Sequence, residues 1–315
     1  MAHQVKTMAW AGAVPWHGLG NELQQGADID TWIQSAGLDW EVKKSPVLFS
    51  ANGTDMENYD GQYVIHRDGA EIIPFGFVGK QYRPVQPKEV LEFYRELTEE
   101  QGFTLETAGQ LFNGEKIWAL ARCGDGFELA GGDKILPYLL LTTGFDGQTA
   151  TVGKFTSIRV VCNNTLTASL NNKSEGRVSI GHRTQFQPDQ MKQKLGVNVE
   201  VFANFENALQ EMVNVKLTQA DANTVINNVL GIDDESRGID IATANFMSNM
   251  FATGNYQGSQ LDSSKGTAFG LLNVVTEFYD HRKSHRNADQ KLNNVWFGSD
   301  EKMKQVFAET LLAMA

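Results

Sequence analysis

The stretch Ile135–Leu166, ILPYLLLTTGFDGQTATVGKFTSIRVVCNNTL, marks the change from predicted sheet to predicted helix in this chain. Tyr138 to Thr143 is a short apolar and β-branched run, which is typical of a buried strand. Asp146-Gly147 predicts a turn, because both residues tolerate a positive φ. The run from Ala150 to Phe155 then predicts a strand that returns from this turn.

The strand pattern stops at Asn163-Asn164. Because an Asn side chain accepts hydrogen bonds from amide groups at a helix start, Asn164 is predicted to cap a short helix through Leu170. Most of the chain before this point has the pattern of strands, and most of the chain after it has the pattern of helices. We therefore predict an α+β fold, with an antiparallel, sheet-rich N-terminal half that carries one or two packed helices, followed by an all-helical C-terminal half. The expected division is a sheet-rich domain over 1–170, a basic loop over 171–187 and a helical domain over 188–315.

Turn signals on either side of this stretch support the same fold class. Asn113-Gly114 predicts a hairpin between strands over 104–112 and 116–122, and Asp68-Gly69 predicts a second one. Asp28 and Gly37 are placed to begin and end a short amphipathic helix, and Pro87 is placed to begin another. Ser263 or Ser264 is expected to begin the longest helix of the C-terminal half.

Composition describes an ordinary globular protein. The 315 residues are 41% hydrophobic and 21% charged, which is enough chain for two domains with their own cores. No apolar run approaches the ~20 residues of a membrane-spanning helix, and the N-terminus lacks the apolar core of a secretory signal. The two cysteines, Cys123 and Cys162, are too few for a disulfide scaffold. We expect a cytoplasmic protein that does not enter a membrane.

The net charge of −11 argues against a protein that binds duplex DNA over its whole surface. The charge is unevenly spread, however. Between Thr151 and Lys194 the chain has seven basic residues and only Glu175 and Asp189 as acidic ones. A basic segment in an acidic chain predicts one defined anionic partner. The alternative is that these cations pair with the acidic flanks or with a neighbouring subunit.

Candidate catalytic residues are few. Cys162 beside Asn163 resembles part of a Cys-His-Asn site, but a cysteine at the end of an apolar strand is more often a buried structural thiol. His17 and His182 each lack a carboxylate partner at a telling spacing, which favours packed or hydrogen-bonded histidines over general bases.

His281 and His285 are four residues apart on a predicted helix and could share one face for a metal. The segment lacks the Glu of a His-Glu-x-x-His site, and its three cations would repel a divalent ion. A solvated basic helix end is the favoured interpretation. The sequence thus predicts no catalytic residue, no metal and no cofactor.

Cations interleaved with aromatic residues point to nucleic acid. Lys80-Gln81-Tyr82-Arg83 places two cations and an aromatic ring at a strand edge, and Lys154-Phe155 with Arg159 repeats the combination. Single-stranded nucleic acid is held in this way, because cations follow the phosphates and rings stack on the bases. The alternative is an ordinary strand edge, with Lys and Arg as protection against edge-to-edge pairing.

A series of longer motifs resembles the phage/plasmid-like protein family, whose members are encoded by phages, plasmids and integrated elements. The matching motifs cover nearly the whole chain: PWHGLG (15–20), AGLDWEV (36–42), FGFVGKQYRPVQ (75–86), ETAG (106–109), PYLLLTTGFDG (137–147), RVVCNNTL (159–166), GTAFGLLNVVTEFYDH (266–281) and WFG (296–298). The order of elements is also similar in outline to the single-strand annealing proteins of phages, of the RecT, Redβ and Erf kind. In those proteins a sheet and a helix of each subunit line a groove that holds DNA.

The first functional hypothesis is a non-enzymatic phage or plasmid protein of the bacterial cytoplasm that binds single-stranded DNA as a homo-oligomer, in recombination or replication. The residues predicted to contact DNA combine six cations with two rings: Lys80, Tyr82, Arg83, Lys154, Phe155, Arg159, Arg177 and Arg183. The alternatives are an interaction protein that blocks a host defence factor, and an enzyme that uses Cys162.

Overall fold

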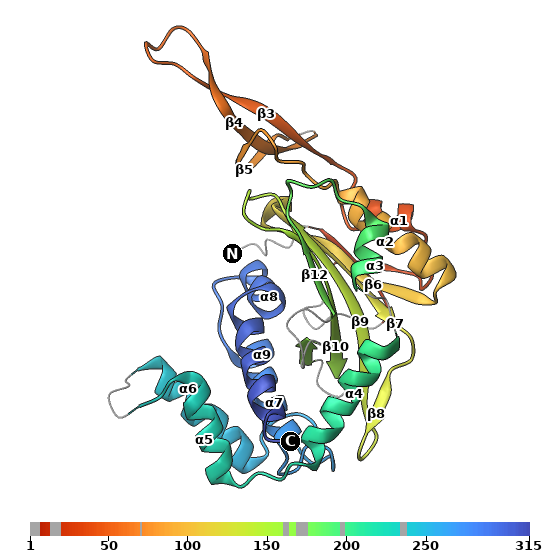
Figure 1. The fold of residues 1–315 in the computed structure, drawn as a ribbon, viewed down its shortest axis with the longest axis vertical. Coiled ribbons are helices and arrows are strands. Elements are labelled where there is room, and N and C mark those ends of the chain that lie inside the picture. The colour runs from red at the N-terminus through yellow and green to blue at the C-terminus, as the bar shows by residue number, and fades with distance from the viewer. Residues whose placement is uncertain are drawn as a thin grey trace. The chain divides into compact units, whose positions relative to one another are not determined.

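The computed structural model describes residues 7–12, 20–69, 71–159, 164–167, 176–195, 199–233 and 238–315. The fold is α+β, as predicted: sheets with few helices form the N-terminal region, and the C-terminal region is largely helical (Figure 1). The chain forms two compact units, and it passes between them several times. The first unit comprises 1–123, 139–154 and 177–197, and the second comprises 124–138, 155–176 and 198–315. Whether 1–170 and 188–315 fold as separate domains stays a prediction.

The described strands belong to two sheets. In the larger sheet the order is β11-β10-β9-β7-β6-β1-β2, while β12 also pairs with β10 and β8 with β9. The smaller sheet has the order β3-β4-β5. The strands are β1 (Met8–Ala11), β2 (Asn21–Leu23), β3 (Glu41–Phe49), β4 (Glu57–Asp68), β5 (Ile73–Gly79), β6 (Phe103–Leu111), β7 (Lys116–Cys123), β8 (Phe127–Leu129), β9 (Asp133–Gly144), β10 (Thr151–Arg159), β11 (Asn164–Thr167) and β12 (Arg177–Ile180).

The hairpin predicted about Asn113-Gly114 is confirmed. β6 and β7 pair antiparallel, from Phe103 opposite Cys123 to Leu111 opposite Lys116. Asn113 lies in the left-handed region with φ of 59°, a conformation that Asn adopts more readily than most residues. The turn at Asp146 is also confirmed, because its carboxylate accepts hydrogen bonds from the amides of Gln148 (2.9 Å) and Thr149 (2.7 Å).

The smaller sheet is an antiparallel meander in the first unit. β3 and β4 pair along their whole length, whereas β5 pairs only with the Gln62–Arg67 part of β4. β3 and β4 therefore continue past the end of β5 as a two-stranded ribbon (Figure 1). The loop between them is short, since β3 ends at Phe49 and β4 begins at Glu57.

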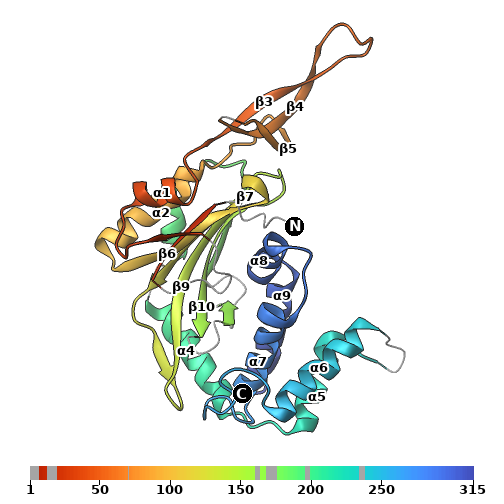
Figure 2. The ribbon, with the colours of Figure 1, turned by 180° about the vertical axis from the view of Figure 1, so that it is seen from behind.

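The described part of the first unit contains three α-helices: α1 (Ile29–Ser35), α2 (Pro87–Glu100) and α3 (Pro188–Leu195). Asp28 caps α1 as predicted, accepting a hydrogen bond from the amide of Thr31 at 2.7 Å. α1 and α2 lie side by side, with α2 against β6 and β7 (Figure 2). The buried hydroxyl of Tyr94 on α2 is 2.8 Å from the carbonyl oxygen of Ala119 and 3.0 Å from that of Leu139, which ties this helix to the sheet.

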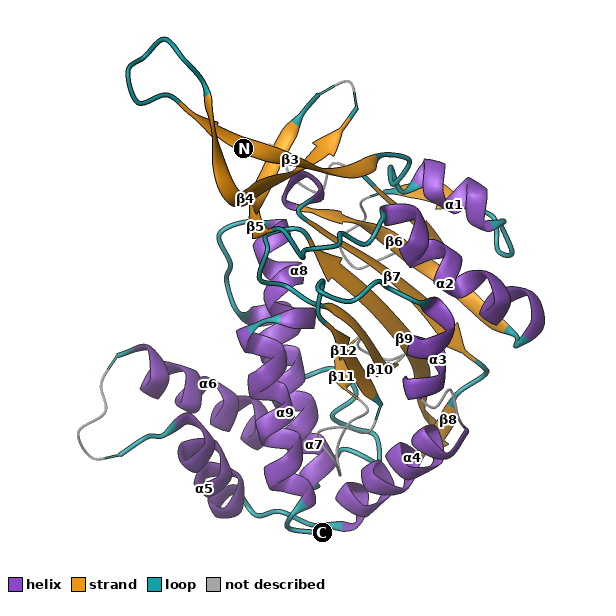
Figure 3. Cartoon of the chain, turned by 45° about the horizontal axis from the view of Figure 1, so that its top comes forward, coloured by secondary structure: helices purple, strands orange, loops and turns teal. Residues whose placement is uncertain are grey.

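The second unit contains the remaining helices of the described chain (Figure 3): α4 (Val199–Asn214), α5 (Gln219–Leu230), α6 (Ile239–Thr253), α7 (Ala268–Glu277), α8 (Ala288–Phe297) and α9 (Ser299–Leu312). α7 is buried along its whole length and contacts α4, α6, α9 and β11. A π-helical turn, η2 (Phe278–Arg282), follows it directly. α7 is thus the centre of this helical core.

Three predictions about local structure are wrong. Asn164 begins β11 and no helix, because residues 164–167 pair antiparallel with β10, from Thr156 opposite Thr167 to Arg159 opposite Asn164. The predicted loop over 171–187 contains β12, whose pairing with β10 satisfies its backbone. The helix expected from Ser263 or Ser264 begins instead at Ala268 after the cap Thr267, and α4 is longer.

Candidate nucleic-acid interface

His182 is the centre of a buried polar cluster in the first unit. β12 pairs antiparallel with β10, with Ile180 opposite Thr151, so the residue two places after the strand reaches the side chain of Thr151. The Nε2 atom of His182 lies 3.0 Å from the hydroxyl oxygens of both Thr143 and Thr151. On the other side of the ring, Nδ1 forms a hydrogen bond with the hydroxyl of Tyr82. His182 therefore joins β9, β10 and the segment that precedes α2.

Burial makes this cluster neutral. Burial lowers the pKa of His182, although the negative charge of Asp146 acts to raise it. It also raises the pKa of Tyr82, in the same direction as the repulsion by Asp146. A neutral imidazole offers one donor and one acceptor, and the surrounding hydroxyls rotate to match them. The prediction that His182 is a packed, hydrogen-bonded histidine is confirmed, and its role in this arrangement is to hold the backbone around it.

The backbone around His182 brings separate cations together. The amide of Arg83 donates a hydrogen bond of 2.6 Å to the carbonyl oxygen of His182. The ammonium group of Lys44 on β3 donates to the carbonyl oxygens of Lys80 (2.8 Å) and Tyr82 (3.0 Å). We call Lys44, Lys80, Arg83 and Arg183 the basic cluster. None of these side chains forms an ion pair within the part of the chain that the structure describes.

Lys80, Arg83 and Arg183 are exposed, and Lys44 is half-buried. Arg177, a further predicted contact, is an exposed residue of β12 and lies outside the basic cluster, opposite Lys154 on β10. The exposed charges thus lie on β12, in the turn after it, and in the segment between β5 and α2. The sequence indicated Lys80, Arg83, Arg177 and Arg183 but not Lys44, because its place depends on the fold of the smaller sheet.

Two predicted contact residues are not accessible. Phe155 is 0% exposed and Lys154 is 3% exposed, so neither offers a surface to a ligand in this conformation. On an inner strand such as β10, an aromatic residue and the stem of a lysine pack into the interior. Arg159 lies in the last position of β10, and its side chain is outside the described part. The predicted contacts by Lys154 and Phe155 are therefore corrected to a buried part of β10.

The aromatic residues near the basic cluster are only partly accessible. Tyr82 is half-buried, with its hydroxyl bonded to His182 and its ring 4.9 Å from the imidazole, centroid to centroid. The ring of Tyr63 lies 4.9 Å from the ammonium of Lys44. Phe77 on β5 is 69% exposed, but its cross-strand partner Val64 places it on the sheet face opposite Tyr63. Charge is thus the main feature of this surface.

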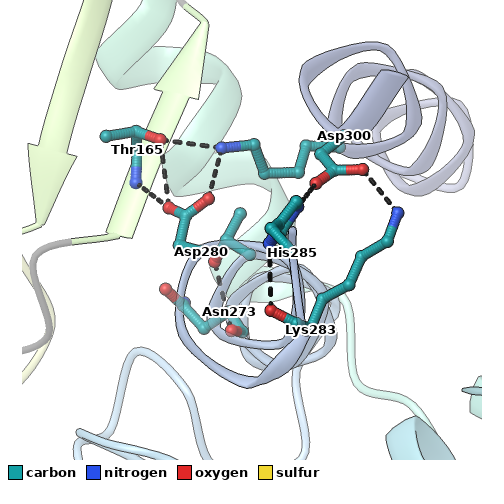
Figure 4. Close-up of polar contacts among 8 residues, drawn as sticks. Thr165, Asn273, Asp280, Lys283, His285 and Asp300 are labelled. Atoms are coloured by element: carbon teal, nitrogen blue, oxygen red, sulfur yellow. Dashed lines mark hydrogen bonds and ion pairs between the residues drawn. The ribbon is translucent and has the colours of Figure 1, made fainter. Parts of the chain in front are cut away.

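A second group of charged residues is buried among the helices of the second unit (Figure 4). The carboxylate of Asp280 accepts hydrogen bonds from the amide (2.7 Å) and hydroxyl (3.0 Å) of Thr165 on β11. Lys304 on α9 lies 2.6 Å from the same carboxylate and 2.7 Å from the Thr165 hydroxyl. Asp280 is 3% exposed and Lys304 is 4% exposed. The three side chains satisfy one another, which is the pattern of a structural ion pair.

His285 belongs to a neighbouring ion-pair group. Its Nε2 atom lies 2.7 Å from the carboxylate of Asp300, and its Nδ1 atom lies 3.1 Å from the carbonyl oxygen of Lys283 (Figure 4). The ammonium of Lys283 is 2.6 Å from Asp300. The predicted solvated basic helix end is confirmed for Arg282, an exposed residue in the last turn of η2, and is wrong for His285, whose side chain is 4% exposed and lies after that turn. The described residues contain no group of three or more His, Cys, Asp or Glu that could hold a metal ion.

Of the two cysteines, the structure describes only Cys123. Cys162, Asn163 and His17 lie outside the described residues. Cys123 is a free thiol at the end of β7, and burial raises its pKa. A raised pKa lowers the fraction of thiolate, so Cys123 is not an activated nucleophile. Among the helices that the structure describes, none is long and apolar enough to cross a membrane.

The arrangement defines an α+β protein whose described part presents cations without ion-pair partners on the sheet-rich unit and buries the carboxylates of two ion-pair groups, Asp280 and Asp300, in the helical unit. The chain belongs to the family described as a domain of unknown function, DUF932, which matches residues 74–296. No curated protein and no solved structure matches the chain. The matched region runs from β5 to α8 and includes Lys80, Arg83, Arg177 and Arg183.

Proposed function

We propose that this protein binds single-stranded DNA as an oligomer, through phosphate contacts with the basic cluster and with Arg177. The observation that carries this proposal is the hydrogen bond from the Arg83 amide to the His182 carbonyl oxygen. It brings Lys80 and Arg83 beside Arg183, although the two segments are far apart in the sequence. Cations that lack carboxylate partners are free to exchange solvent counterions for phosphates.

The overall charge supports a local contact of this kind. With a net charge of −11, most of the surface repels a nucleic acid, so binding is expected only where cations gather. A single strand bends easily and can follow a short path of charges, whereas a straight duplex would also approach the acidic surroundings. Tyr82 and Tyr63, both half-buried, are the rings available for contact with bases.

The biological setting is part of the same proposal. The motifs shared with the phage/plasmid-like protein family support a protein of a phage, plasmid or integrated element that acts in the cytoplasm of a bacterial host. The similarity in outline to single-strand annealing proteins favours recombination or replication as the process. No enzymatic step is needed for this role.

Fluorescence anisotropy with a labelled single-stranded oligonucleotide tests the proposal. Phosphate contacts by the four exposed cations, Lys80, Arg83, Arg177 and Arg183, at ~0.7 released counterions each give a slope of about −3 for log K against log salt. Charge reversal of Arg83 and Arg183 removes two contacts, so we expect the slope to shrink by about 1.4 and the affinity at low salt to fall. Binding that is absent at low salt, or that does not change with salt, would contradict the proposal.

A matched control is Lys194→Glu, because Lys194 is an exposed cation of α3 outside the basic cluster. It changes the net charge in the same direction without touching the proposed contacts. We expect its salt slope to equal that of the unaltered protein. A parallel titration with duplex DNA measures the preference for single strands. If Lys194→Glu lost as much affinity for the oligonucleotide as the charge-reversal variant of Arg83 and Arg183, the loss would be a non-specific effect of net charge.

A further inference from the structure

The smaller sheet of the first unit carries a segment with no partner in the described structure. Every residue from 48 to 62 is exposed, and this segment comprises the end of β3, the connecting loop and the start of β4. We call residues 48–62 the arm. The arm is two-stranded, because β5 pairs only from Gln62 onward (Figure 3). A two-stranded ribbon is at best marginally stable in water by itself.

The arm exposes large apolar side chains. Leu48 is 50% exposed, Phe49 42%, Met56 67% and Tyr59 55%. Phe49 and Tyr59 contact each other edge to face, with ring centroids 6.1 Å apart, and leave their outer surfaces uncovered. Apolar side chains grouped on a surface indicate a contact with another macromolecule.

The charge of the arm restricts the choice of partner. It contains the carboxylates of Asp55, Glu57 and Asp60, and no Lys or Arg occurs anywhere between Ser45 and His66. An acidic ribbon repels nucleic acid, and two arms placed against each other would bring six carboxylates together. The surface that complements the arm is therefore basic, with some apolar area beside the cations.

We infer that the arm of one copy of this chain docks on the basic cluster of a second copy. The basic cluster has the complementary charge, and the nearby stems of its Lys and Arg side chains, with Tyr63 and Tyr82, provide apolar area. The arm and the basic cluster are different surfaces, so the contact is head-to-tail. Each copy then has one free arm and one free cluster, and the assembly grows until it closes into a ring or extends as a filament.

This contact does not depend on the proposed function, since it forms without DNA. It has a consequence for that function, because the same cations cannot serve an arm and a phosphate backbone at once. Single-stranded DNA therefore competes with the arm of the neighbouring copy. An oligomer binds DNA at the clusters from which the DNA has displaced an arm, and at the free cluster of the terminal copy of an open assembly. A variant without a functional arm leaves the basic cluster open for DNA.

Light scattering after size-exclusion chromatography, without DNA, tests the inference. We expect the unaltered protein to elute at low salt with a mass well above the 34.9 kDa of one chain, and at high salt with a smaller mass. The arm variant Met56→Ser/Glu57→Gln/Tyr59→Ser should have the mass of one chain. So should the cluster variant Lys80→Ala/Arg83→Ala/Arg183→Ala.

The decisive sample is an equal mixture of the two variants. The cluster variant still has an arm and the arm variant still has a cluster, so one contact forms and we expect twice the mass of one chain, with no larger species. A mixture that keeps the mass of one chain would overturn the inference. A cluster variant that still assembles would also overturn it, because the arm would then have another partner. The same holds if the unaltered protein has the mass of one chain at low salt.

The matched control for the arm variant is Glu71→Gln/Ile72→Ser. It removes one exposed carboxylate and one exposed apolar side chain from the turn between β4 and β5, outside the arm. We expect this control to assemble like the unaltered protein. A control that loses assembly as the arm variant does would overturn the role of the arm. DNA binding by the arm variant at low protein concentration separates the two proposals, because it reports on the basic cluster alone.

Discussion

The amide nitrogen of Arg83 lies 2.6 Å from the carbonyl oxygen of His182, within a hydrogen bond that joins the segment before α2 to the turn after β12. The side chain of the same histidine is held by Thr143, Thr151 and Tyr82. One residue thus fixes the position of two basic segments from inside the fold. Changes to His182 should therefore affect both the stability of the first unit and the geometry of the basic cluster.

The first prediction concerns pH. Burial lowers the pKa of His182 in the folded chain below the ordinary value of 6.5. As the pH falls below 6.5, the unfolded chain takes up a proton that the folded chain does not, so the unfolded state is stabilised relative to the folded state. The contribution of His182 to stability is fully present above pH 6.5 and is lost as the pH falls toward the lowered folded pKa.

The comparison is with His182→Gln, which keeps a donor and an acceptor but does not titrate. Urea unfolding from pH 7 to about pH 5 should show a steeper loss of stability in the unaltered protein than in the variant. At pH 7 the variant is expected to be less stable by about 1–3 kcal/mol, because its amide cannot meet all three hydroxyls. If the free energy of unfolding depended on pH in the same way in both proteins, His182 would not be buried in its neutral form.

The buried ion pair of the second unit gives the second prediction. Lys304→Met removes the cation that forms an ion pair with Asp280 and leaves a buried carboxylate with the hydrogen bonds of Thr165 and the more distant charge of Lys291. Loss of one partner of a buried pair costs about 3–5 kcal/mol. The further change Asp280→Leu removes the stranded charge, so the double variant should recover part of this loss. Thermal unfolding followed by circular dichroism measures both effects.

Lys43→Met is the control for this experiment. Lys43 pairs with Asp68 on the smaller sheet, where the side chains are 51% and 36% exposed. An exposed pair is worth at most about 1 kcal/mol, since water already solvates both charges. If Lys304→Met destabilised the protein no more than Lys43→Met does, the ion pair of Asp280 and Lys304 would be accessible to water and not buried.

Local turn and cap signals predicted much of the fold. Asn113-Gly114 and Asp28 act through residues next to them in sequence, so the β6–β7 hairpin and α1 were predicted with nearly correct bounds. Asn164 shows the limit of such signals. Its tendency to cap a helix is outweighed by the pairing of β11 with β10, which the residues around Asn164 do not encode.

The candidate site could be predicted only in part. Lys80 and Arg83 were predicted at a strand edge and Arg183 in a loop, and cations in both settings stay accessible. Lys154 and Phe155 have the same residue types but lie on an inner strand, and burial is decided by the neighbours of that strand. The place of Lys44 beside Lys80 depends on a contact between β3 and the end of β5, which no local pattern indicates.

The last prediction concerns the packing at the start of α7. A Cβ atom at Gly270 would lie 1.8 Å from the carbonyl oxygen of Ser264 and 3.0 Å from the hydroxyl of Tyr256. Both distances are too short, and the shorter one involves backbone that cannot move without shifting the helix cap at Thr267. Gly270→Ala should therefore destabilise the protein by about 1–3 kcal/mol or more, although alanine favours helix by about 1 kcal/mol over glycine.

The control is Gly181→Ala, where a Cβ atom meets nothing within 4 Å and φ is not positive. We expect the control to stay within about 0.5 kcal/mol of the unaltered protein in urea unfolding. If the two variants were equally stable, Gly270 would have room for a Cβ atom, and its packing against Ser264 and Tyr256 would be less close than the distances indicate.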